Sequence, residues 1–230
     1  MKMANDPQNY DVLKEKQRVL RAGFSEALTL RVHRALSWLG RAEAANDDND
    51  VRFILLWVGF NAAYAGDVSA EIENERGAFK TYFDTLVRLD GKHRIYNAVW
   101  ERFPHEIRVL LNNRFVFSPF WQNVNGKPGY EDWKERLERS HRTMSVALAQ
   151  HNTSLVLSTL FDRLYVLRKQ LVHGGATWNS KLNRDQVRDG SAVLGWLLPI
   201  FIDIMMDNAD TDWGRPYYLV LDQFDRAASH

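Results

Sequence analysis

The chain has 230 residues, with 30 lysines and arginines against 29 aspartates and glutamates, for a net charge of +1. This length suffices for a single packed domain over residues 1–230, and the balanced charge argues against a protein that binds nucleic acid through bulk electrostatics. The absence of cysteine excludes disulfides and thiol chemistry. Because residues 1–9 are polar and lack an apolar signal core, we expect a cytoplasmic protein.

The first part of the chain predicts two long helices. Residues 1–22 are polar and are expected to form a tail, either frayed or with a short helix from Val12 to Leu20. Ser25 is a suitable N-cap for a helix over 24–45. The next helix, over 51–65, is apolar nearly all round, which is typical of a helix surrounded by others.

Residues 66–129 are predicted to be an insertion of short elements. They contain Phe115 to Trp121, an aromatic cluster around a proline, which we expect to be irregular. Two interpretations of this cluster stay open. It is either a hydrophobic plug over the core, or a surface that stacks with bases or contacts a partner.

Three helices are predicted in the remainder, over 130–150, 153–173 and 184–208. The last contains an apolar run that is interrupted by a proline and an aspartate. Since this run is too short to span a bilayer, we expect a buried helix and no membrane association. Residues 209–230 are expected to form an extended C-terminal tail.

Together these elements predict an all-α protein. The four-helix antiparallel bundle is formed by 24–45, 51–65, 130–150 and 153–173, with 184–208 as an additional helix beside it and 66–129 inserted between the second and third helices.

The helix over 153–173 ends in the most unusual pattern of the chain. Arg168 lies among apolar residues that recur at three-and-four spacing, so we expect its guanidinium to be half buried and to need a partner or a ligand. His173 follows at the helix end, where Gly174 is expected to take the left-handed conformation and the unpaired carbonyls favour a protonated imidazole. The sequence therefore predicts a cation and a titratable ring together at an open site.

The spacing between these two residues is not specific by itself, because Arg-x-x-x-x-His occurs three times. The pattern that starts at Arg88 straddles an Asp-Gly turn, and the one that starts at Arg136 lies on a heavily charged face. Only Arg168 and His173 end an apolar helix that is followed by glycine.

Structural roles remain open for the same residues. Arg168 is available to pair with Asp162 or Asp203 of neighbouring helices, and His173 to cap its helix. Asn61, a polar residue in the apolar second helix, is either a hydrogen-bonded core amide or a group that orients Arg168 or His173 across a helix pair.

Other chemistries find no support in the sequence. There is no His-Glu-x-x-His, no glycine-rich phosphate loop at a helix N-terminus and no strand-to-helix nucleophile elbow. We therefore expect neither a metal nor a cofactor.

The segment from Leu167 to Gly174 resembles the Arg-x(4–6)-His motif of the HEPN superfamily. The segment from Phe60 to Ala65 resembles the Phe-Asn-x-x-Tyr sequence of some prokaryotic members. The resemblance covers 24–65 and 130–208. Many members have Asn, Asp or His directly after the arginine, where this chain has Lys169.

This resemblance implies a homodimer that cleaves RNA without a metal, leaving a 2′,3′-cyclic phosphate and a 5′-hydroxyl. Such a protein would be a toxin or phage-defence effector with an antitoxin or another protein partner. His173 would be the general acid or base and Arg168 the phosphate clamp, with Lys169, Asn61 and Tyr64 in support. The alternative is a non-catalytic helical adaptor that binds a nucleotide, RNA or a partner protein.

Overall fold

A computed structural model of the chain describes residues 7–64, 72–181 and 183–216. All regular structure in these residues is helical, which confirms the all-α prediction for this part of the chain. Ser25 caps its helix as predicted, because its side chain accepts a hydrogen bond from the Leu28 N–H at 3.2 Å.

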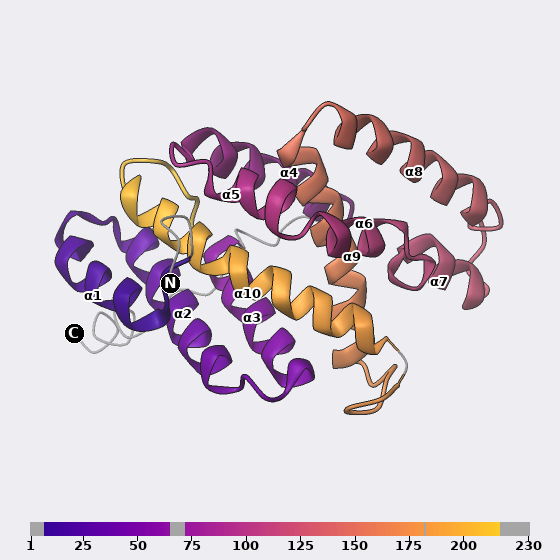
Figure 1. Cartoon of the computed structure of the whole chain (residues 1–230), viewed down its shortest axis with the longest axis horizontal. Coiled ribbons are helices and arrows are strands. Elements are labelled where there is room, and N and C mark those ends of the chain that lie inside the picture. The colour runs from indigo at the N-terminus through magenta and orange to yellow at the C-terminus, as the bar shows by residue number, and fades with distance from the viewer. Residues whose placement is uncertain (1–6, 65–71, 182, 217–230) are drawn as a thin grey trace, which may run out of the picture.

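The main helices in chain order are α1 (Tyr10–Leu20), α2 (Glu26–Ala44), α3 (Asn49–Tyr64), α4 (Ile72–Leu89), α5 (Arg94–Asn97), α6 (Pro104–Asn112), α7 (Ser118–Val124), α8 (Trp133–Ala149), α9 (Thr153–Val172) and α10 (Arg184–Asp207) (Figure 1). Short helical turns are η1 (Arg21–Gly23), η2 (Ala98–Arg102) and η3 (Arg114–Val116).

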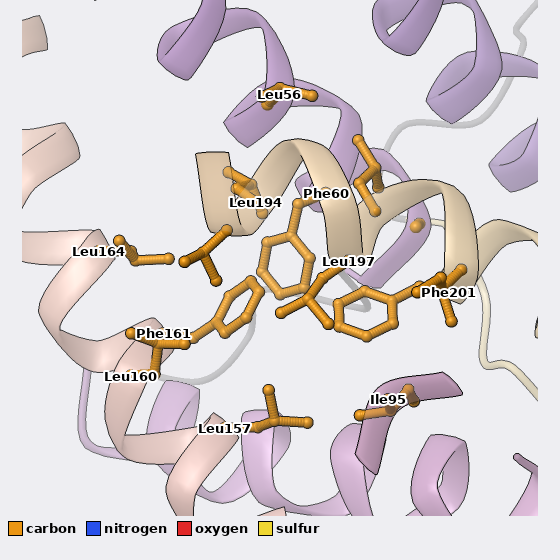
Figure 2. Close-up of a cluster of buried hydrophobic side chains, with 14 of the residues drawn as sticks. Leu56, Phe60, Ile95, Leu157, Leu160, Phe161, Leu164, Leu194, Leu197 and Phe201 are labelled. Carbon is orange, nitrogen blue, oxygen red and sulfur yellow. The ribbon is translucent and has the colours of Figure 1, made fainter. Parts of the chain in front are cut away.

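The core is built around α10, which crosses the molecule between the other long helices (Figure 1). Figure 2 shows Phe60 of α3, Phe161 of α9 and Phe201 of α10 converging at its centre. The ring centroids of Phe60 and Phe161 lie 4.4 Å apart, and those of Phe161 and Phe201 lie 6.0 Å apart. The last helix is therefore the centre of the fold, whereas we had placed it beside the bundle.

A second core helix is α4, which lies within the segment predicted to be an insertion of short elements. Its Phe83 and Leu86 are fully buried, and the Phe83 ring lies 4.7 Å from that of Phe161. The prediction that 66–129 as a whole is an insertion of short elements is therefore wrong. The apolar residues of α4 form one face that packs on α9. Because α9 is distant in the sequence, the pattern of α4 alone does not show that this face is buried. Residues 65–71 lie outside the described part of the chain.

In contrast, α8 is a peripheral helix, whereas the sequence predicted that it belongs to the four-helix bundle. Only Met144 and Ala147 are buried in it, and it leans against α9 at the edge of the molecule (Figure 1). Its first turns carry charged side chains that face solvent, so they contribute no apolar surface to a core.

Both ends of the described chain are attached to the bundle. α1 buries Leu13 and Gln17, so the short-helix alternative is the one observed for the N-terminal segment. The guanidinium of Arg31, which is 1% exposed, donates to the carbonyl oxygens of Gly214 and Arg215 at 3.1 and 3.0 Å. Beyond residue 216, the predicted C-terminal tail lies outside the described residues.

The hydropathy and the burial of α10 together bear on whether this helix could cross a membrane. The helix is long and apolar enough to cross a membrane by composition alone, but 83% of its most apolar window is buried inside the protein. It continues as one helix on both sides of Pro199. The sequence predicted a buried helix here, and this burial is observed.

Candidate functional site

The C-terminal end of α9 is formed as predicted. His173 is the C-cap residue, and Gly174 has a φ of 70°, in the left-handed region. The Gly175 N–H donates to the carbonyl oxygen of Gln170 at 2.7 Å. The helix thus stops directly after Val172, and His173 is exposed at its end.

A cavity of about 640 Å³, which we call the α9 cavity, opens beside this helix end. This volume lies within the range of small-ligand sites in proteins. Its walls come from η3 and α7 with the residue that follows (Phe115, Ser118, Trp121, Gln122, Asn125), the end of α9 (Val166, Lys169, Gln170, His173, Gly175) and the start of α10 with the loop before it (Lys181, Asn183, Arg184, Asp185, Gln186).

Gln170 holds the three walls of the cavity together. Its Nε2 donates to the carbonyl oxygen of Phe115 at 2.6 Å, and its Oε1 accepts from the Nδ2 of Asn183 at 2.8 Å. The indole N–H of Trp121 donates to the same Phe115 carbonyl at 2.7 Å. Since each wall is fixed to the next, the cavity is a preformed feature of the fold.

The loop between α9 and α10 is anchored on the N-terminus of α3. The indole N–H of Trp178 donates to Asp48 at 2.7 Å, and Arg184 donates to the buried Asp50 at 2.6 Å. The hydrogen bond from the Val51 N–H, together with that from Trp178, holds the pKa of Asp48 below its usual range. These carboxylates position the loop and with it the rim of the cavity.

The charge of the cavity is predominantly positive. Lys169, Lys181 and Arg184 line it together with the single carboxylate of Asp185. Arg184 is held by Asp50, whereas Lys169 and Lys181 make no ion pair with the described residues. The first turn of the long helix α10 also faces the cavity, without a side-chain cap. Because helix N-termini carry partial positive charge, the whole arrangement favours an anion.

Arg168 does not line this cavity, although His173 and Lys169 do. Each residue advances an α-helix by about 100°, which places Arg168 about 160° around α9 from Gln170. Its side chain is half-buried and makes no hydrogen bond or ion pair with the described residues. The sequence predicted that the guanidinium of Arg168 and the imidazole of His173 share one open site. Within one chain, the two groups do not meet in the cavity.

Neither carboxylate considered as a partner for Arg168 pairs with it. Asp203 is bound instead by Lys16 and Arg94, and it lies about 28 Å along α10 from the cavity at 1.5 Å per residue. No ion pair joins Asp162 to Arg168 within the described part of the chain.

Asn61 and Tyr64 lie far from His173. Phe53 and Leu167 approach the same glycine of α10. Phe60, later in α3, contacts Phe161, which lies one to two turns before Leu167 in α9. α3 and α9 are therefore antiparallel, and the helix rise puts Asn61 about 20 Å from His173 along the helix axes.

Asn61 and Tyr64 lie among residues that pack the protein and not among residues of the cavity. Tyr64 stacks on Phe60 with ring centroids 5.2 Å apart and packs against Phe79 at 4.7 Å. Asn61 is half-buried and forms no hydrogen bond with the described residues. No described residue is therefore its hydrogen-bond partner, and its distance from His173 argues against a role in orienting that residue.

The aromatic segment is partly buried and partly in the wall of the cavity. Val116 and Phe117 are buried, as expected of a plug. Phe115 and Trp121 line the cavity, and Phe115 is 39% exposed. The segment is not irregular, however, because Pro119 stands in the first turn of α7, where a proline is tolerated.

Sequence reasoning missed Trp121, Gln170, Lys181 and Asn183 as parts of the site. One signal was available for the last two. A short connection between two helices brings the end of the first close to the start of the second, and this brings the start of α10 to His173. Nothing local in the sequence indicates that Trp121 reaches α9.

Comparisons with protein-family models, curated proteins and solved structures found no match to this chain.

Proposed function

We propose that this protein binds single-stranded RNA in the α9 cavity and cleaves it without a metal, in the manner of HEPN ribonucleases. The observation that carries the proposal is that His173 and Lys169 line the same cavity as Phe115 and Trp121. Aromatic rings stack on bases, lysines bind phosphates, and an exposed imidazole transfers protons. This combination fits a nucleotide segment better than it fits an apolar ligand.

In this reaction each of the two His173 imidazoles of a homodimer carries out one proton transfer. The neutral ring of His173 takes the proton of a ribose 2′-hydroxyl as that oxygen attacks the adjacent phosphorus. The bond between phosphorus and the 5′ oxygen breaks, which leaves a 2′,3′-cyclic phosphate. The protonated ring of His173 in a second copy of the chain gives its proton to the leaving 5′ oxygen. Lys169 and Lys181 offset the negative charge that develops on the phosphate oxygens.

A homodimer also gives Arg168 a role. In its own chain this residue lies outside the cavity and makes no hydrogen bond or ion pair with the described residues, so in this proposal it reaches the phosphate from the second copy. Because each cleavage needs the imidazoles of both copies, an equal mixture of wild-type and His173→Ala protein is expected to keep roughly a quarter of the activity of the same amount of wild-type protein, since a quarter of the randomly mixed dimers carry both rings. A mixture that keeps half of the activity would reject the shared site.

The direct test is cleavage of labelled single-stranded RNA in the presence of a chelator. His173→Ala is expected to lower the rate about 10²- to 10⁴-fold, as for loss of a general acid or base. Lys169→Met is expected to lower it about 10²-fold. His105→Ala, at an exposed histidine of α6 away from the cavity, serves as the matched control and leaves the rate unchanged. Cleavage that survives in His173→Ala would reject the proposal.

The alternative function is RNA or nucleotide binding without turnover. A specific observation favours it: His173 is the one histidine among the described residues that line the cavity, and the guanidinium of Arg168 is outside it. Retention of intact RNA by the wild-type protein, with weaker retention by Lys169→Met and no product from either, would establish this alternative.

A further inference from the structure

A second basic hollow lies on the opposite side of the bundle, between α1 and α2. The two helices are antiparallel neighbours (Figure 1), and a groove of about 710 Å³ runs along their outer face. We call it the α1–α2 groove. It shares no lining residue with the α9 cavity, so it stands independently of the function proposed above.

The close approach of the two helices forms the floor of this groove. A Cβ at Gly40 would lie 2.9 Å from the ring of Tyr10, so only glycine lets α1 pack this closely. The Tyr10 N–H donates to both carboxylate oxygens of Glu43 at 3.0 and 3.2 Å. The groove therefore has a fixed shape, and its nearest carboxylate on α2 is bound to the backbone of α1.

The charges along the groove are cationic and unneutralised. Lys14, His33 and Arg41 line it, and no carboxylate is among the described residues that do so. Among the described residues, the Lys14 ammonium donates one hydrogen bond, to the amide oxygen of Gln17 at 2.7 Å. Arg41 is exposed and forms no ion pair with the described residues. Three basic groups thus share a hollow that supplies no counter-charge.

Arg18 and Arg21 also act on the Lys14 ammonium, although Arg18 is itself paired with Glu15 at 3.0 Å. Burial, followed by the charges of Arg18 and Arg21, lowers the pKa of the Lys14 ammonium. Repulsion between like charges costs free energy in the unliganded protein. A bound anion would remove that cost, which is the behaviour expected of an anion site.

An aromatic ring stands beside these cations. Trp38 lines the groove and is 39% exposed. Its Cβ lies 3.4 Å from the position that a Cβ at Gly59 of α3 would take, so the base of the side chain is held between two helices. An indole fixed at its base and open at its ring is suited to stack on a flat group next to a bound phosphate.

We infer that the α1–α2 groove is a binding site for nucleotide phosphate, in which Lys14 and Arg41 contact the phosphate and Trp38 stacks on the base. A free nucleotide and a nucleotide within an RNA strand both present this combination of a phosphate and a base. A lysine and an arginine that line one groove can together neutralise one or two phosphates, and the indole ring distinguishes a nucleotide from inorganic phosphate.

The experiment uses the full chain with His173→Ala, Lys169→Ala and Lys181→Ala, so that the α9 cavity contributes neither cleavage nor its two lysines. Binding of uridine 5′-monophosphate is measured by calorimetry, and binding of a fluorescent oligouridylate by anisotropy. Adding Lys14→Glu with Arg41→Glu is expected to weaken binding at least about tenfold and to reduce the salt dependence by about 1.4 in log–log slope, for two phosphate contacts. Trp38→Ala is expected to weaken it about tenfold, while Trp38→Phe retains most of the affinity.

The matched control reverses two exposed cations elsewhere, with Arg139→Glu and Arg142→Glu on α8, whose side chains are 58% and 71% exposed. It is expected to bind like the background protein. Where charge reversal unfolds the protein, Lys14→Gln with Arg41→Gln replaces it. Binding of the mononucleotide identifies a free-nucleotide site, and binding of the oligouridylate alone identifies a contact with the strand.

Three results would overturn the inference: no binding of either probe to the background protein, unchanged affinity in the groove variants, or an equal loss in the α8 control. None of these depends on cleavage by the wild-type protein, so failure of the groove and failure of the proposed ribonuclease are separate outcomes.

Discussion

The buried carboxylate of Asp203 ties three parts of the fold together. It lies on α10 with 2% of its side chain exposed, accepts a hydrogen bond from Lys16 of α1 at 2.5 Å and is bound by the guanidinium of Arg94. Asp203→Asn keeps the size of the side chain and removes its charge. We expect this single change to cause a large loss of stability.

The magnitude follows from burial. Arg94 is only 9% exposed, and breaking a buried ion pair from one side costs about 3–5 kcal/mol because the other charge is left uncompensated. The amide oxygen still accepts one hydrogen bond, and Asp90 lies 3.8 Å from the Nε of Arg94. Both reduce the loss, so we expect about 3 kcal/mol, or a fall in Tm of about 6–12 °C for a chain of this size.

Urea unfolding followed by far-ultraviolet circular dichroism measures this loss. Asp207→Asn is the matched control, since Asp207 contacts the same Lys16 at 2.5 Å but is 40% exposed. An exposed pair contributes at most about 1 kcal/mol. Equal losses in the two variants would refute the argument that burial of the network determines its contribution.

Two further outcomes are expected. Burial acts to raise the pKa of Asp203, but the hydrogen bonds from Lys16 and Arg94 outweigh it and hold the pKa below its usual range. Its stabilisation is therefore present above about pH 4 and lost as pH falls through the lowered pKa, so the gap between wild type and Asp203→Asn in urea unfolding should narrow below that pH. Gly190→Val should cost about 1–3 kcal/mol by overpacking, because a Cβ there would lie 3.0 Å from a methyl group of Leu164. In thermal unfolding Gly91→Val, with open space around its Cβ, should show a much smaller change.

The candidate site was predictable where it depends on one helix end. The apolar spacing, the histidine and the glycine predicted that α9 stops at His173 with Gly174 in the left-handed region, and both are observed. Lys169 was named from its place beside the motif arginine, and it lines the cavity. Arg168 was predicted to share that site, but the turn of the helix carries its side chain away from the cavity.

Residues remote in the chain were outside the reach of this reasoning. The hydrogen bond from Gln170 to Phe115 joins positions 55 residues apart, and the one from Trp178 to Asp48 spans 130. The placement of Asn61 and Tyr64 depended on the direction of α3 relative to α9. The Phe-Asn-x-x-Tyr pattern contains no information on that direction.

The sequence by itself determined that the described chain is helical, where most helices lie and how α9 ends. These properties depend on periodicity, caps and glycine, which act within one or two turns. Only the tertiary structure decided that α4 belongs to the core, that α8 lies outside it and that α10 stands at its centre. Burial is shared between segments distant in sequence, so an amphipathic face predicts that a helix packs but does not identify its neighbour.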